Sequence, residues 1–332
     1  MTQLLDKHGR TINYLRLAIT DRCNLRCQYC MPEIGNKFVE RKQLLTFKEM
    51  YRLVRVLSGL GVNKVRLTGG EPFVRTDFMN FLEMLSFNNN LDEINITTNG
   101  VLLPKYLQEI EKLSKIKSIN LSLDTLKTHR FAAITRQDSF SKVMESFEFL
   151  KSSEKLKLKL NFVVQSEVNT DEIIDFIELT KNENIAVRFI EEMPFNGIGQ
   201  KDFNQLWDFK TILTHIQQHY SHINKIDSAK SSTSVNFKIP NYKGTFGIIP
   251  AFTRTICNDC NRIRITSTGM FKNCLFDEGV FSVRDFIRNG ASDDDLKELF
   301  INTVHHKPEN GFVAEQNRKN NSISESMSNI GG

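Results

Sequence analysis

The six cysteines of the chain fall into two groups of three, and none lies outside these groups. The first group is Cys23, Cys27 and Cys30, and the second is Cys257, Cys260 and Cys274. Disulfide pairing within a trio would leave an odd thiol, and a structural zinc ion usually takes four protein ligands. Three thiolates can instead hold three irons of a [4Fe–4S] cluster and leave the fourth iron open to another ligand. The spacing therefore favours two such clusters, with structural zinc as the alternative.

Two arginines closely follow the CxxC pair of the second group. Arg262 and Arg264 stand two and four residues after Cys260, so their side chains share one face of a strand. Guanidinium groups suit phosphate oxygens because they donate hydrogen bonds in a planar fork. The pattern is compatible with an anionic ligand beside the second cluster, and equally with a solvated strand face.

Short β-rich runs alternate with amphipathic stretches from residue 14 to about residue 190. Strands are expected at 14–20, 64–68, 93–98, 118–123, 158–164 and 186–191. Helices are expected at 46–61, 139–153 and 170–182, with Gly61 as a helix stop. Strands separated by helices indicate parallel βα units, arranged as a barrel or as a doubly wound sheet. The first cysteine group directly follows the first strand, at the end where barrel active sites lie.

Basic side chains occupy one face of four of these strands. They are Arg16, Arg66, Lys159 and Arg188, and their strand neighbours on either side are mainly apolar. Central strands of an ordinary doubly wound sheet are apolar on both faces. The repeated pattern therefore favours a barrel whose interior holds a charged ligand. The alternative is a set of solvated faces on edge strands.

The rhythm of the sequence changes after residue 195, and we predict a domain at 1–195 and a smaller α+β domain at 196–332. The second part has helical patterns near 205–220, 281–289 and 293–303, and short strands around 243–249 and 262–266. It carries the second cysteine group. The final 14 residues are polar, and their default interpretation is a disordered tail.

Composition excludes several classes of protein. The chain has 332 residues, with 44 Lys and Arg against 39 Asp and Glu, so its net charge is only +5. This charge is too diffuse for a surface that coats nucleic acid. No apolar run approaches the roughly 18 residues of a membrane span, and the N-terminus lacks a signal peptide. We therefore expect a cytoplasmic protein without a membrane or nucleic-acid partner.

Two segments together resemble the radical S-adenosylmethionine (SAM) superfamily. They are CNLRCQYC at 23–30 and GGEP at 69–72, directly after the second expected strand. A lone GGEP is more often a turn, but here it stands one βα unit after the cysteines. The resemblance implies a partial (β/α)6 barrel of the TIM type. It also implies that the open iron of the first cluster chelates the amino and carboxylate groups of SAM.

With the second cysteine group, the chain resembles the GTP 3′,8-cyclase family over essentially its whole length. The matching segments are 15–32, 65–72, 96–100, 119–124, 187–194, the CxxC-N-R-I-R segment and the terminal IGG at 330–332. The resemblance implies conversion of GTP to 3′,8-cyclo-7,8-dihydro-GTP, the first step of molybdopterin cofactor biosynthesis. The implied cofactors are SAM and two [4Fe–4S] clusters. The implied partners are GTP, an external electron donor and a downstream pterin-forming enzyme, and the sequence allows a homodimer without specifying it.

The resemblance also implies roles for individual residues. The SAM contacts would be Tyr29 through its backbone, Gly70, Ser122 and Met193. The GTP contacts would be Arg16, Arg66, Thr97, Lys159, Arg188, Arg262 and Arg264. Gly331 and Gly332 would reach into the active site and act there with Arg262 and Arg264, which reverses the default interpretation of the tail. The chain departs from the family pattern after GGEP, where Thr76 replaces the second of two arginines.

Two other functions stay open at this point. One is a different radical SAM enzyme, such as a peptide modifier with an auxiliary cluster, although such domains usually carry more than three cysteines. The other is a zinc or iron–sulfur protein that binds nucleic acid without catalysis. That function requires a concentrated basic surface, whereas the cations singled out above lie within strands.

Overall fold

Twelve strands of the described chain form one sheet in the order β12-β11-β10-β1-β2-β3-β4-β5-β6-β9-β8-β7. The computed structural model describes residues 3–31, 38–193, 206–228, 231–318 and 327–331. The strands are β1 (Tyr14–Ala18), β2 (Lys64–Thr68), β3 (Glu93–Thr98), β4 (Ile116–Ser122), β5 (Lys157–Val164), β6 (Ala186–Glu191), β7 (Asn224–Ile226), β8 (Val235–Lys238), β9 (Thr245–Ile249), β10 (Arg262–Ile265), β11 (Met270–Lys272) and β12 (Phe281–Ser282). The helices are α1 (Phe47–Gly59), α2 (Phe78–Ser86), α3 (Leu107–Ile110), α4 (Thr128–Thr135), α5 (Phe140–Ser152), α6 (Ile173–Glu178), α7 (Phe209–His219), α8 (Val283–Arg288), α9 (Asp293–His305), α10 (Gly311–Gln316) and α11 (Met327–Ile330).

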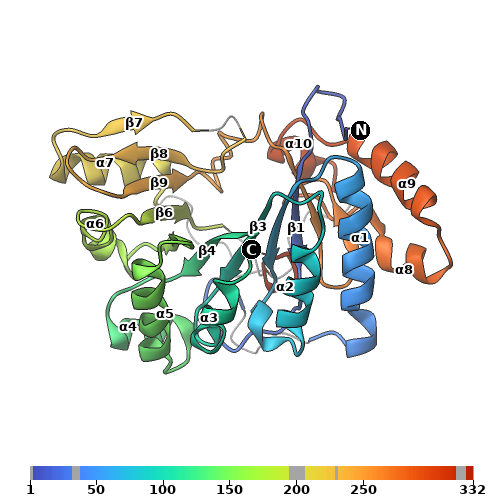
Figure 1. Cartoon of the computed structure of the whole chain (residues 1–332). Helices are drawn as coiled ribbons and strands as arrows, with labels where there is room; N and C mark the ends of the chain where they lie inside the picture. Colours follow the sequence, from blue (N-terminus) through green and yellow to red (C-terminus); the bar gives the residue numbers. More distant parts are fainter. Residues whose placement is uncertain (1–2, 32–37, 194–205, 229–230, 319–326, 332) are drawn as a thin grey trace.

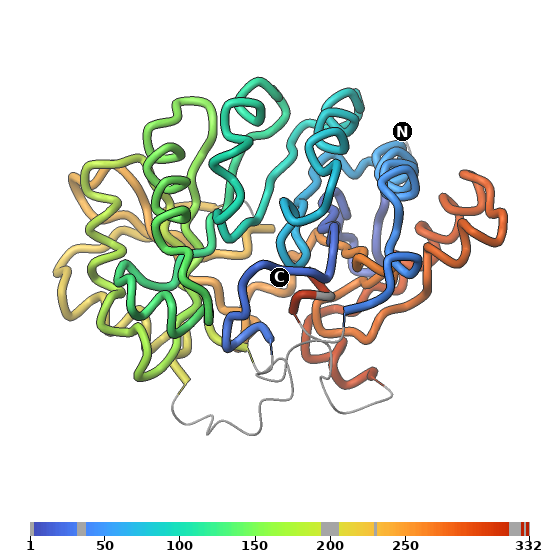
Figure 2. Tube along the Cα trace, turned by 90° about the horizontal axis from the view of Figure 1, so that it is seen from below, coloured from blue at the N-terminus to red at the C-terminus, as the bar shows by residue number. Residues whose placement is uncertain are grey.

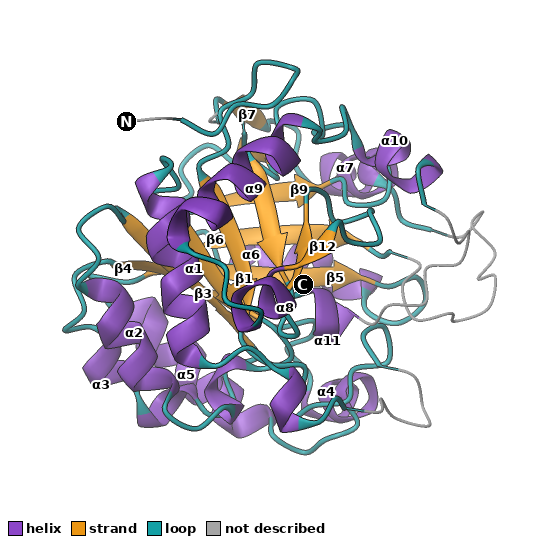
Figure 3. Cartoon of the chain, turned by 90° about the vertical axis from the view of Figure 1, so that its right-hand side faces the viewer, coloured by secondary structure: helices purple, strands orange, loops and turns teal. Residues whose placement is uncertain are grey.

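Strands β1 to β6 lie side by side in chain order, and every neighbouring pair is parallel. Helices α1 to α6 lie on one face of this part of the curved sheet (Figure 1, Figure 3). This arrangement is the predicted partial (β/α)6 barrel, and all six predicted strands are confirmed. Among the described residues, no helix has both the length and the apolar composition to cross a membrane.

The two faces of the sheet differ because side chains alternate along each strand. Leu15 and Leu17 of β1 and Val65 and Leu67 of β2 are fully buried in the main apolar core. Helix α1 closes this core from outside. It starts at a capping box between Thr46 and Glu49. The predicted stop is also confirmed, since Gly61 has φ +94° directly after the C-cap of the helix.

The C-terminal region extends the same sheet at both edges. Strand β10 pairs in parallel with β1, and β9 pairs in parallel with β6. The predicted strands near 243–249 and 262–266 are therefore confirmed as β9 and β10. The predicted boundary between residues 195 and 196 lies outside the described residues and stays a prediction.

Some elements were not predicted. Strands β7 and β8 come from the polar stretch near residues 224–238, where no clear alternation of apolar residues announces a strand. At the end of the chain the default interpretation as disordered is wrong for 327–331. These residues form α11 and a turn, and Ile330 is only 1% exposed.

Candidate active site

The first cysteine group lies on the loop that follows β1, and residues from the loops after β2 and β3 contact this loop. The Cys23 Sγ accepts from the backbone N–H of Leu25 at 3.4 Å and from Asn99 Nδ2 at 3.5 Å. The GGEP segment packs directly on this loop, since Gly70 N donates to Thr20 O at 2.7 Å. A Cβ at Gly70 would stand 2.2 Å from Arg22 O, so the close approach requires glycine.

The second cysteine group lies at the opposite end of the neighbouring strand. Cys260 stands two residues before β10, and Tyr14 at the start of β1 is in register with Arg262 at the start of β10. Cys274 follows the antiparallel strand β11 and so returns to the same end. Because β1 and β10 are parallel, the two groups lie at opposite ends of one strand pair. Five residues of β1 span about 15 Å between them.

Both groups suit iron–sulfur clusters by their donor atoms. All six cysteines are free thiols of intermediate exposure. No three His, Cys, Asp or Glu side chains of the described residues converge as ligands of one metal ion do. A cubane cluster does not need that convergence, because its three thiolates bind three different irons. Cys23, Cys27 and Cys30 would hold one cluster, and Cys257, Cys260 and Cys274 the other.

Burial and charge set the thiol pKa values differently in the two groups. In the first group, burial raises the pKa of Cys23 to about 11 and that of Cys30 to about 12. These thiols therefore ionise on binding metal, which deprotonates a coordinating thiol. In the second group, burial also opposes ionisation of Cys260, but Lys307 and Arg262 lower its pKa to about 6.

Lys307 was not singled out from the sequence. It is 2% exposed, donates from Nζ to Arg262 O at 2.8 Å and also hydrogen-bonds Asn273 O. It thereby joins β10 to the residue before Cys274. Asp277 completes this loop, because its Oδ2 accepts from Cys274 N at 2.7 Å. No local pattern marks Lys307, since its partners are more than 30 residues away.

The end of the chain reaches the loop after β1 (Figure 2). Arg264 Nη1 donates to Gly331 O at 2.9 Å. The backbone of Ser328 hydrogen-bonds the Cys30 thiol. A Cβ at Gly331 would lie 2.8 Å from Thr68 Cγ2 and 3.1 Å from Ala18 Cβ, and φ there is +80°. This position agrees with the expected approach of the tail to the active site, while Gly332 lies outside the described residues.

Gly331→Val is therefore expected to reduce turnover by about 10- to 100-fold, because the side chain pushes the tail away from Ala18 and Thr68. The measurement is the rate of product formation with SAM and nucleotide under anaerobic conditions. Gly290→Val is the matched control. Gly290 also has positive φ, at +92°, but nothing lies within 4 Å of its Cβ position. Equal turnover in the two variants would remove the functional role from the tail.

The predicted cations form a layer across the inner face of the sheet. Strand register places Arg16 level with Arg66 on one side and with Arg264 on the other. Arg66 donates to Tyr14 Oη at 2.6 Å and to Thr97 Oγ1 at 3.2 Å, which joins two predicted GTP contacts. Lys159 and Arg188 belong to the paired strands β5 and β6 of the same sheet. The inner face thus gathers the basic residues that alternation along the strands had placed there.

Mutual repulsion and burial destabilise the charged forms of this layer. Burial, with Arg264 and Arg66, holds the pKa of Arg16 well below its ordinary value. Burial, with Arg188 and Arg66, lowers the pKa of Lys159 to about 7. The Arg188 Nε is buried and has no hydrogen-bond partner among the described residues. Buried cations that repel one another favour a polyanionic ligand, which would place negative charge beside them.

Three of the predicted SAM contacts, Tyr29, Gly70 and Ser122, lie in or beside the first cysteine group. Ser122 at the end of β4 lines a small cavity together with Cys27 and Tyr29. Gly70 lies against the loop that leads to Cys23. Met193 instead packs on a small apolar cluster of Phe276, Ala314 and Ile330, against which Cys274 of the second group also packs. Their contacts with SAM stay predictions.

Two protein-family models match the two parts of the chain that carry the two cysteine groups. The model of the radical SAM superfamily matches residues 17–180, and that of Molybdenum Cofactor Synthesis C matches residues 185–313. A GTP 3′,8-cyclase of Clostridium botulinum is 38% identical over 330 residues, which covers 99% of this chain and all of that protein. The GTP 3′,8-cyclase of Syntrophomonas wolfei is 37% identical, with 95% and 98% covered. The chain belongs to the GTP 3′,8-cyclase family. SAM and [4Fe–4S] clusters are therefore its cofactors, as predicted.

Longer relatives also match the chain, and a solved structure has a similar fold. Human molybdenum cofactor biosynthesis protein 1 is 39% identical over 304 residues, covering 92% of this chain and 48% of that protein. The chain thus spans about half the length of such relatives. The structure of Streptococcus suis SuiB bound to S-adenosylmethionine is similar with a TM-score of 0.61 at 15% identity, covering 95% of this chain and 71% of that one. At this identity the likeness shows the fold alone, and it confirms the radical SAM architecture.

Proposed function

We propose that this member of the GTP 3′,8-cyclase family converts GTP to 3′,8-cyclo-7,8-dihydro-GTP, the first step of molybdopterin cofactor biosynthesis. The observation that carries the proposal is the cation layer between the two cysteine groups. A triphosphate offers several anionic oxygens to guanidinium forks. Family relatives that bear the name GTP 3′,8-cyclase over their full length support the choice of GTP.

Two sets of basic side chains would bind different parts of the nucleotide. Arg16, Arg66 and Lys159 would bind the triphosphate, with Arg188 beside them. Arg262 and Arg264 would hold the nucleotide near the second cysteine group, so that the guanine would lie beside the cluster that Cys257, Cys260 and Cys274 would hold. SAM bound at the first cluster would supply, on one-electron reduction, the radical chemistry that removes the 3′ hydrogen of the ribose.

The backbone around the site would keep this chemistry away from water. Arg264, a member of the cation layer, donates a hydrogen bond to Gly331 O near the end of the chain. The arginine that would bind the nucleotide would therefore also position the tail. A side-chain-free residue is needed there because Thr68 and Ala18 leave no room for a Cβ.

The proposal extends to partners and place. An external donor would supply the electron, and a pterin-forming enzyme would take the product without a stable complex being required. We place the enzyme in the cytoplasm, where thiols stay reduced. The homodimer, allowed by the sequence, stays a prediction.

The pH dependence of GTP binding tests the triphosphate site. The pKa of Lys159 is about 7 without ligand, so this lysine is mostly neutral above pH 7 and must take up a proton to pair with phosphate. GTP affinity should therefore fall as pH rises from 7 to 9, approaching about tenfold per pH unit. Isothermal titration of the cluster-loaded protein with GTP, without SAM or reductant, measures this slope.

Lys159→Arg is the control for that slope. A guanidinium keeps its charge throughout this pH range, so the variant should bind GTP with little dependence on pH. Lys159→Met should bind GTP more weakly at pH 7 and also show a flat profile. A flat profile in the unsubstituted protein, with an affinity equal to that of Lys159→Met, would show that Lys159 does not bind the triphosphate.

A further inference from the structure

Tyr29 occupies the position between the second and third cysteines of the first group. Its hydroxyl donates to Asp124 Oδ2 at 2.7 Å, and its side chain also hydrogen-bonds the Cys27 thiol. Asp124 is 6% exposed and stands two residues beyond the end of β4. Its other oxygen, Oδ1, accepts from the backbone N–H of Val163 in β5 at 2.8 Å. One carboxylate thus joins the cysteine loop to the sheet.

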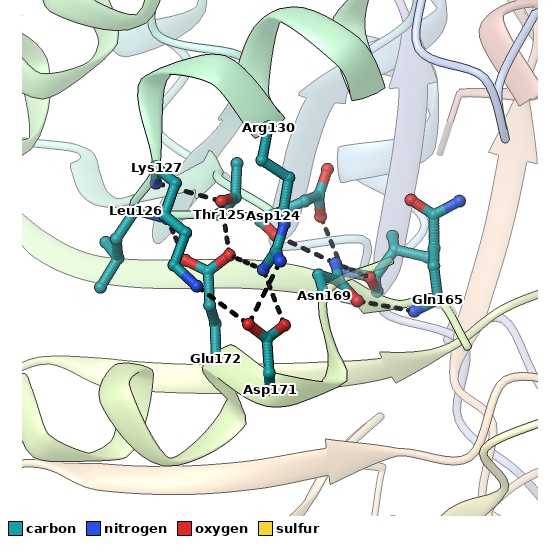
Figure 4. Close-up of polar contacts among 10 residues, drawn as sticks. Asp124, Thr125, Leu126, Lys127, Arg130, Gln165, Asn169, Asp171 and Glu172 are labelled. Atoms are coloured by element: carbon teal, nitrogen blue, oxygen red, sulfur yellow. Dashed lines mark hydrogen bonds and ion pairs between the residues drawn. The ribbon is translucent and has the colours of Figure 1, made fainter. Parts of the chain in front are cut away.

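The backbone of Asp124 is itself held from the next loop. Asn169 Nδ2 donates to Asp124 O at 3.0 Å and to Val163 O at 2.9 Å. The side-chain oxygen of the same asparagine accepts from Gln165 N at 2.9 Å. Figure 4 shows Asn169 between Asp124 and Gln165, so the ends of β4 and β5 are locked to each other.

The residues after Asp124 are fixed by a second set of contacts. Glu172 is fully buried and accepts from Thr125 Oγ1 at 2.6 Å and from Leu126 N at 2.7 Å. Arg130 pairs with Glu172 and, at 2.7 Å, with Asp171 (Figure 4). The segment from Asp124 to Arg130 is therefore a rigid support, and Asp124 is the residue of it whose side chain the Tyr29 hydroxyl contacts.

The segment from Asp124 to Arg130 and the predicted SAM contact Ser122 both lie at the carboxyl end of β4. Ser122 lies two residues before Asp124, and both line the small cavity beside Cys27 and Tyr29. Movement of the Tyr29 ring would therefore change the spacing between the cysteine loop and Ser122. Mutation of outer-shell groups that orient a metal site typically costs about 10- to 100-fold in metal affinity or activity.

We propose that Asp124 is a positioning residue, which clamps the Tyr29 hydroxyl and thereby sets the cysteine loop at the distance from β4 that SAM binding requires. Asp124 touches neither SAM nor substrate in this role. The proposal rests on SAM as the cofactor of the chain and is independent of the choice of GTP.

Tyr29→Phe tests the clamp because it removes only the hydroxyl. The cluster-loaded variant should keep its iron content and bind SAM about tenfold more weakly. The change that SAM causes in the electron paramagnetic resonance spectrum of the reduced first cluster should also be altered. Titration calorimetry and this spectrum are recorded without nucleotide, so a failed GTP assignment would leave both readouts unaffected.

Tyr220→Phe is the matched control. It also removes a tyrosine hydroxyl that donates to a carboxylate, Glu178 Oε1 at 2.6 Å, but neither residue lines the cavity beside Cys27 and Ser122. It should lower the melting temperature and leave SAM affinity unchanged. If it weakens SAM binding as much as Tyr29→Phe does, the effect is one of general stability and the proposal is wrong.

A double-mutant cycle adds a test that does not depend on a single variant. Asp124→Ala removes the acceptor of the Tyr29 hydroxyl and should weaken SAM binding. The double variant with Tyr29→Phe should lose less SAM affinity than the sum of the two single losses, because the Tyr29–Asp124 contact is absent from both single variants. Additive losses would mean that the two residues act separately and would overturn the clamp. Unchanged SAM affinity in Tyr29→Phe would overturn it as well, even if Asp124→Ala fails to fold.

Discussion

Cys30→Ala is expected to reduce cleavage of SAM, and with it conversion of GTP, to below detection. Cys30 belongs to the loop after β1 and contacts the end of the chain through Ser328. Without it, two thiols remain for a cluster that needs three protein ligands to leave one iron open. Iron content should fall from about eight to about four atoms per chain. The measurement is 5′-deoxyadenosine formed from SAM with a strong reductant.

The control for this result is a check that the Cys30→Ala variant still folds. Cys30 lies outside the main apolar core, so its loss should leave the secondary structure intact, and circular dichroism checks this. A folded Cys30→Ala protein that still cleaves SAM at the unsubstituted rate would place the SAM-binding cluster elsewhere.

Cys274→Ala is expected to abolish GTP conversion while leaving some reductive cleavage of SAM. Cys274 lies at the far end of the β1–β10 pair, about 15 Å along the strand from the first cysteine group. Its neighbours Lys307 and Asp277 belong to that end alone. The variant should also lose about four irons per chain, which makes it the reciprocal control for Cys30→Ala. Two assays on one preparation, for 5′-deoxyadenosine and for the cyclised nucleotide, give the result.

Loss of both activities in folded Cys274→Ala with an intact first cluster would contradict this division. The roles of the two cysteine groups would then be assigned wrongly. Full retention of GTP conversion would instead remove the second cluster from substrate binding.

The strands of the barrel could be predicted because each repeats a period of two over five to eight residues. That same alternation placed Arg16, Arg66 and Lys159 on one face, and register in the sheet then brings Arg16 level with Arg66 and Arg264. Strands β7 and β8 could not be predicted in this way. They are short and polar, and the pairing of β8 with β9 and of β7 with β8, rather than their own pattern, makes them strands.

The parts of the site that could be predicted are motifs whose residues are close in sequence. The cysteine spacings and GGEP are such motifs. Asp124, Asn169 and Lys307 do not, because each acts through a partner that the fold brings from 30 or more residues away or from a separate loop. No sequence pattern predicts the pairing of β10 with β1, although this pairing places the two cysteine groups at opposite ends of one strand pair.

The dependence of SAM cleavage on nucleotide tests the central claim most directly. The cluster-loaded protein is incubated without oxygen with SAM, a reductant and, in separate reactions, GTP, ATP, CTP or UTP. We expect GTP alone to raise 5′-deoxyadenosine formation and to yield an equal amount of cyclised nucleotide. Formation of 5′-deoxyadenosine at the same rate with every nucleotide, and no cyclised product from GTP, would contradict the account.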